Sequence, residues 1–252
     1  AGHSAAVGAL LGQDAHIPAA TVVGAEALAR LAAFVLVAAV VIGYIVLSGQ
    51  GKKTEHLADR ETVDVAFDSQ FGDNSVTLAS ATPATDAVEV DLYEDYSCSY
   101  CAQLAENTDE QMQAAIEAGD LIVNVRTLNF LDRGNADGHS TRAAAAVLAL
   151  AEAGETDVYW NYRAAILDEQ EEIYNKWSND DFAAAAQELG ASDSVVETIR
   201  SGENVGAAND LTTANADKLE AETGQVSSPR VVRDGKDVEV DDINQWIDAV
   251  LN

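Results

Sequence analysis

Apolar residues are most concentrated near the start of the chain, where positions 31–47 contain no polar break. No charged residue occurs between Arg30 and Lys52, which leaves 21 uncharged positions. A helix of that length crosses the ~30 Å hydrocarbon core of a bilayer at about 1.5 Å per residue. We therefore predict a transmembrane helix at 30–50 after a tail at 1–29. A buried core helix and a cleaved signal peptide are the alternatives, but the run lacks a polar stripe and is longer than a usual signal sequence.

Beyond this run, short alternating and apolar segments predict strands. We interpret 51–74 as a linker with a lead-in strand, because positions 61–67 alternate between polar and apolar residues. A second strand is expected at 76–80. The next three elements are a strand at 87–93, a helix at 102–118 and a strand at 121–126. Their order makes a βαβ unit with parallel strands.

The second half of the chain changes to a helical period. We expect an inserted helical domain at about 139–222, with glycines separating its helices. The predicted helices are 139–153, 157–168, 180–189, 192–201 and 203–222. Strands at 230–233 and 236–240 then flank Asp234-Gly235, a hairpin signal, and a closing helix begins at Asp241 or Asp242. The pattern indicates an α/β domain at 75–252.

Charge and cysteine count narrow the possible functions. The chain carries 14 basic and 43 acidic residues, for a net charge of −29. Such a surface repels phosphates, so we expect no nucleic-acid partner. The only two cysteines are Cys98 and Cys101. They exclude a disulfide scaffold that joins distant segments and a zinc site made of four cysteines.

Cys98 and Cys101 lie between the predicted strand at 87–93 and the helix that follows. Backbone N–H groups and the dipole at a helix N-terminus stabilise a thiolate, so Cys98 is the candidate nucleophile. Cys101, one turn further, is the candidate resolving thiol, and a Cys98–Cys101 disulfide can form without distortion. A metal site, for which the histidines are too few and too distant, and an inert structural disulfide are weaker alternatives. Haem attachment needs a histidine where Ala102 stands. We expect no metal and no cofactor.

The motif Cys98-Ser99-Tyr100-Cys101, preceded by Asp95-Tyr96 and by a strand, resembles the active site of DsbA-like thiol-disulfide oxidoreductases. These proteins also insert a helical domain into a thioredoxin fold. The resemblance implies that Ser228-Pro229 is the late pair whose cis-proline faces the cysteines and whose backbone binds the substrate peptide. The expected architecture is a thioredoxin fold with a helical insertion, preceded by one transmembrane helix.

Two departures from this family pattern concern the redox chemistry. The buried acid that the family places six residues before the first cysteine falls on Leu92, and the neighbouring Asp91 points to the opposite face of its strand. The dipeptide Ser99-Tyr100 replaces the frequent Pro-His. In addition, the charges of Glu94 and Asp95 would oppose a very low pKa for Cys98. We expect a couple that is less oxidising than the strongest oxidants of the family.

The leading functional prediction is thiol-disulfide exchange on extracytoplasmic proteins by a single-pass membrane protein. Positions 31–47 would contact the lipid bilayer, and the C-terminal domain would be extracytoplasmic. The two lysines after the apolar run, Lys52 and Lys53, outnumber the single Arg30 before it, and by the positive-inside rule this mildly favours the reverse orientation. A long domain, however, crosses a membrane largely regardless of its charge. The alternative is a structural or assembly subunit of a larger membrane complex that uses the thioredoxin fold as a binding module.

Overall fold

The computed structural model describes residues 29–41 and 53–252. The chain divides into two units, Ala1–Ser48 and Gly49–Asn252, and in the first of these positions 29–41 are helical. Within the described ranges, no helix is both long and apolar enough to cross a bilayer. Positions 42–50 of the predicted span, and all but the last residue of the predicted tail, lie outside the described residues. The transmembrane helix therefore stays a prediction.

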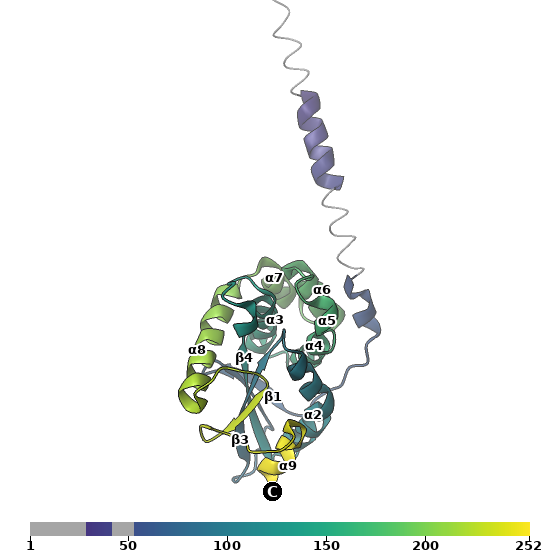
Figure 1. Cartoon of the computed structure of the whole chain (residues 1–252). Coiled ribbons are helices and arrows are strands. Elements are labelled where there is room, and N and C mark those ends of the chain that lie inside the picture. The colour runs from purple at the N-terminus through teal and green to yellow at the C-terminus, as the bar shows by residue number, and fades with distance from the viewer. Residues whose placement is uncertain (1–28, 42–52) are drawn as a thin grey trace, which may run out of the picture. The chain divides into compact units, whose positions relative to one another are not determined.

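A six-stranded sheet in the order β1-β2-β4-β3-β5-β6 forms the centre of the second unit (Figure 1). Strands β3 and β4 are parallel, and the other pairs are antiparallel. The parallel pair confirms the predicted βαβ unit. The strands are β1 (Asp68–Gly72), β2 (Ser75–Ala79), β3 (Val88–Asp95), β4 (Leu121–Leu128), β5 (Arg230–Arg233) and β6 (Lys236–Asp237).

Helices cover both faces of the sheet, and the insertion extends from it (Figure 1). The helix after β3, α2 (Ser99–Glu117), packs against β2 and β4 of the sheet, and α9 (Trp246–Leu251) packs against α2. Helices α3 (His139–Ala153) and α8 (Val205–Thr223) pack against each other and against β4. The remaining helices of the insertion are α4 (Thr156–Asp168), α5 (Gln170–Ile173), α6 (Asn179–Glu188) and α7 (Asp193–Ser201), and three short 3-10 turns lie at Glu55–Asp59, Phe130–Asp132 and Ile243–Gln245.

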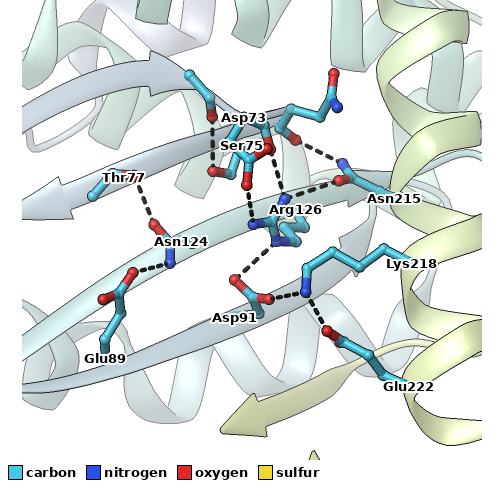
Figure 2. A network of polar contacts seen from close by, with 12 residues as sticks. Asp73, Ser75, Thr77, Glu89, Asp91, Asn124, Arg126, Asn215, Lys218 and Glu222 are labelled. Atoms are coloured by element: carbon cyan, nitrogen blue, oxygen red, sulfur yellow. Dashed lines mark hydrogen bonds and ion pairs between the residues drawn. The ribbon is translucent and has the colours of Figure 1, made fainter. Parts of the chain in front are cut away.

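Alternation along β3 sorts its side chains onto two faces of the sheet. Leu92 is buried in the same core cluster as Cys101. Asp91 points the other way, as predicted, and its carboxylate lies 2.8 Å from Nε of Arg126 and 3.3 Å from Nζ of Lys218 (Figure 2). Since Lys218 belongs to α8, this network ties α8 to the central strands. Asp91 therefore cannot stand in for the acid that is missing at Leu92.

The predicted lead-in strand at 61–67 is wrong. These residues form no strand, and β1 begins at Asp68. The backbone here bonds to side chains instead: Val63 N–H donates to Asn161 Oδ1 at 2.9 Å, and Ala66 N–H donates to Glu117 Oε1 at 3.0 Å. Of the apolar positions in this pattern, Val65 and Phe67 pack against the core but Val63 is 43% exposed, so the alternation reflects burial only in part.

Ion pairs fasten the earlier part of this lead-in segment to the helical insertion. Lys53 pairs with Asp181 at 2.8 Å, and Arg60 pairs with Asp168 at 2.8 Å.

The predicted strand and helix at the C-terminus are both present, but each is shorter than predicted. The second strand of the last hairpin covers only Lys236–Asp237, and the closing helix begins at Trp246 after a 3-10 turn.

Candidate active site

The two cysteines lie where β3 ends and α2 begins. A turn, in which Cys98 N–H donates to Asp95 O at 2.9 Å, brings Cys98 to the N-cap of α2. Cys101 follows one turn later, and its N–H donates to Cys98 O at 3.0 Å. Cys98 is 7% exposed and Cys101 is 2% exposed. Both thiols are free in this structure, so the disulfide between them stays a prediction.

Ser228 and Pro229 reach the cysteines from the far end of the sequence. Strand β5 begins directly after Pro229 and pairs with β3. Because α2 follows β3, this pairing places the Ser228-Pro229 bond beside the start of α2. This peptide bond is cis. The carbonyl oxygen of Ser228 lies 3.5 Å from Sγ of Cys98, and Pro229 lines a narrow enclosed space beside Cys101. The structure thus brings together all four residues that the sequence singled out.

The two thiols differ strongly in acidity. The pKa of Cys98 is lowered to about 6, first by the hydrogen bond from the Cys101 thiol and further by the N–H groups of Cys101 and Tyr100. Burial raises the pKa of Cys101 well above its usual value, and the hydrogen bond to Cys98 adds to this. At neutral pH the pair is therefore a Cys98 thiolate beside a protonated Cys101.

Asp95 is fully buried and joins the active-site turn to the helical insertion. Its carboxylate accepts hydrogen bonds from Ser97 N–H at 2.9 Å, Leu131 N–H at 3.2 Å and Ser140 Oγ at 2.5 Å. Burial raises the pKa of Asp95 to about 6 despite these bonds. The sequence identified Asp95 as part of the motif but could not show that it fixes the turn against α3, because Ser140 comes from another element.

Glu94 forms a buried ion pair on the other side of the dithiol. Arg163 of α4 contacts its carboxylate at 2.7 Å and also contacts Asp109 of α2 at 2.7 Å. Glu94 and Arg163 are each 2% exposed at the side chain, and burial raises the pKa of Asp109 to about 6. These three residues, Leu92 and Cys101 line the same enclosed space.

This arrangement changes the expectation about the acids before the motif. Arg163 neutralises Glu94, and Asp95 is held by three donors, so neither charge ranks among the main influences on the pKa of Cys98. Sequence reasoning missed Arg163, since a single arginine within a helix carries no signal of its burial.

Among the described residues, no group of three His, Cys, Asp or Glu is placed to hold a metal ion.

The site consists of two thiols at the start of a helix, after a central parallel strand and opposite a cis-proline. This arrangement is typical of thioredoxin-fold proteins that catalyse thiol-disulfide exchange. The thioredoxin family model matches residues 83–249. The chain is 46% identical to the MdbA protein, a thiol-disulfide oxidoreductase from Corynebacterium diphtheriae, with a TM-score of 0.75 over 77% of this chain and 98% of the other. The chain belongs to the thioredoxin family, as a DsbA-like thiol-disulfide oxidoreductase, which confirms the resemblance found in the sequence.

Two further relatives show the range of these similarities. The MdbA thiol-disulfide oxidoreductase from Corynebacterium matruchotii is 38% identical, with a TM-score of 0.75 over 79% of this chain and 99% of its own. The serine/threonine-protein kinase PknE from Mycobacterium tuberculosis is 25% identical over 146 residues, which are 56% of this chain. The match spans only 25% of the length of that kinase, so it concerns one segment of it.

Proposed function

We propose that Cys98 is the attacking thiol and Cys101 the resolving thiol of an enzyme that exchanges disulfides with extracytoplasmic proteins. In the oxidising direction, a client thiolate attacks Sγ of Cys98 in the Cys98–Cys101 disulfide. A mixed disulfide forms, and Cys101 leaves and takes up a proton. A second client thiolate then attacks the client sulfur and releases Cys98 as a thiolate. The client gains one disulfide, and its two electrons reduce the enzyme pair.

The observation that carries this proposal is the opposite shift of the two thiols. Cys98 is a better leaving group because its pKa is lowered to about 6, whereas Cys101 holds its proton. In the oxidising direction, the mixed disulfide between Cys98 and a client therefore breaks by release of the Cys98 thiolate. In the reducing direction, Cys101 gives up its proton, attacks Sγ of Cys98 and releases the client thiolate. The Ser228 carbonyl beside Cys98 and the backbone next to Pro229 lie where an extended client segment would run. We assign substrate-backbone binding to Ser228 and Pro229.

An extracytoplasmic location suits this chemistry because protein disulfides persist in oxidising compartments. The apolar run at 31–47 would anchor the chain in the membrane, with the thioredoxin-fold domain on the outer side. Protein thiols and disulfides outside the cytoplasm would then be its partners.

The direct test uses the full chain, purified in mild detergent, in two assays. Wild type should accelerate insulin reduction by dithiothreitol, and its oxidised form should speed the refolding of a reduced disulfide protein. Cys98→Ala should lose both activities, while Cys101→Ala should accumulate mixed disulfides with its client. Equal rates for wild type and Cys98→Ala would refute the proposal.

A further inference from the structure

A groove of about 400 Å³ opens on the side of α2 that faces the helical insertion. It begins at Ser99, next to Cys98, and runs between α2 and the helices α4 and α5. It lies apart from Ser228 and Pro229, which do not line it.

The charge of this groove is one-sided. Four acids line it, Glu106, Asp109, Asp168 and Glu171, against the single base Arg60. Arg60 is already engaged by Asp168 at the rim. Glu106 and Glu171 are exposed, and in the part of the chain that the structure describes neither has a hydrogen-bond or ion-pair partner. Facing acids in one concave site raise the local concentration of cations.

Gln170 gives the groove a built polar acceptor. The residue is only 7% exposed, and its Nε2 donates to Ser97 O at 2.8 Å, directly before the nucleophile. Its Oε1 is buried and has no hydrogen-bond partner among the described residues. Oδ1 of Asp109 is likewise buried and unpartnered, while Oδ2 binds Arg163. Buried acceptors without donors are costly unless a ligand supplies the N–H groups.

We propose that this groove binds a lysine or arginine side chain of the client, close in sequence to the reacting cysteine. This inference rests on the proposed function and adds a client class to it. An ammonium or guanidinium group carries the donors that Gln170 and Asp109 lack, and its charge matches Glu106 and Glu171. The stem of the side chain would lie along Ala102, Ala105 and Leu167. Clients with acidic residues beside the cysteine are disfavoured by the same charges.

The test compares peptides that differ only beside a single cysteine, which is flanked by lysine, glutamine or glutamate. Each peptide is supplied as its homodimeric disulfide, so that attack on either sulfur gives the same product. The reduced full chain is mixed with each peptide, and the second-order rate of mixed-disulfide formation is measured. Wild type should prefer the lysine peptide over the glutamate peptide, and added salt should weaken the preference.

Two matched double variants test whether the rate preference comes from the groove or from the overall negative charge of the protein. Glu106→Gln with Glu171→Gln should reduce the lysine-to-glutamate rate ratio about fivefold, which corresponds to an ion-pair contribution of about 1 kcal/mol. Glu188→Gln with Glu203→Gln removes two exposed acids from α6 and from the turn after α7, and should keep the wild-type ratio. The intrinsic reactivity of each peptide cancels in this comparison.

The outcomes distinguish this inference from the function beneath it. If wild type reacts with none of the peptides, the proposed function itself fails. If wild type reacts with all three peptides at equal rates, or if both double variants lower the ratio equally, the enzyme stands and the groove proposal is refuted. Equal rates in wild type refute the groove proposal without any variant, so a folding defect in either variant leaves the proposal falsifiable.

Discussion

The acidity of Cys98 gives the sharpest prediction for a single residue. The Cys101 hydrogen bond and the first N–H groups of α2 favour the thiolate. Absorbance of the reduced protein at 240 nm should therefore rise with a midpoint near pH 6. Cys98→Ala should remove this step, and Cys101→Ala should shift it upward because the strongest donor is lost. A midpoint above pH 8 in wild type would contradict the geometry described for the thiols.

The same shift sets the sign of a stability effect in the reduced form. Between about pH 6 and the pKa of an unfolded cysteine, the unfolded chain holds a proton that native Cys98 has released. Stability therefore rises with pH across this window, and this contribution is lost as pH falls through about 6. Urea unfolding of the reduced protein at pH 5.5 and pH 7.5 (roughly the two sides of the midpoint) measures it as the difference between wild type and Cys98→Ala. The subtraction is needed because Asp95 and Asp109, whose pKa values burial raises to about 6, lower the stability of both proteins over the same window.

The pKa of Cys98 also bears on the redox poise expected from the sequence. A value of about 6 lies between the ~3.5 of the strongest oxidant and the ~7 of thioredoxin. The dithiol form is thus stabilised less than in that oxidant. Equilibration with glutathione should give a potential below about −120 mV. The less oxidising couple stays a prediction until that titration is made.

Local motifs explain why the sequence identified Cys98, Cys101, Ser228 and Pro229, and why it stopped there. The cysteines are recognisable from spacing between a strand and a helix, and the proline from its place before the last hairpin. Gln170 contacts the residue before Cys98 from 73 positions away. Long-range packing of this kind leaves no periodic signal, so the supporting side chains could only be found in the structure.

Among the elements, the period of the apolar residues correctly predicted the βαβ unit and most helices, but it did not predict the position of the first strand. The turn at Asp73 and Asn74, with φ of 48° and 56°, joins β1 to β2 and has the residue types that left-handed turns favour. Reading that turn would have moved the strand from 61–67 to Asp68–Gly72. The alternation at 61–67 is the stronger pattern, but only Val65 and Phe67 pack against the core, and Val63 is exposed.

Helix α4 is coupled to β3 and α2 through one side chain, which makes Arg163 the test of this packing. Arg163→Met would leave Glu94 and Asp109 buried without their cation, and we expect a loss of about 3–5 kcal/mol in the free energy of unfolding at pH 7. The loss should be smaller at pH 5, because burial raises the pKa of Asp109 to about 6 and this carboxyl is then largely protonated. Denaturant unfolding by circular dichroism measures both.

The matched control for this variant is Arg200→Met. Arg200 is 38% exposed at its side chain and pairs with Asp180 and Glu197 at the surface, so its loss should cost about 0.5 kcal/mol or less. Equal unfolding midpoints for the two variants would show that the buried ion pairs of α4 do not hold the site together.

For the whole molecule, the predictions concern attachment to a membrane and the side on which the thioredoxin-fold domain would lie. If 31–47 spans the bilayer, the protein should stay in the membrane fraction after high-salt and alkaline washing. A membrane-impermeant thiol reagent should label Cys98 in intact, reduced cells, and Cys98→Ala provides the background. Labelling that begins only after lysis would place the domain inside and overturn the extracytoplasmic assignment.

The separation of 130 residues between Cys98 and Ser228 also has a consequence in time. A ribosome that adds about 5–20 residues per second makes Cys98 and Cys101 roughly ten seconds before Pro229. During that interval the nascent chain carries both thiols without β5, which completes their surroundings. The helical insertion is made in the meantime. The Ser228 carbonyl can therefore lie beside Cys98 only after β5 has been made and has paired with β3.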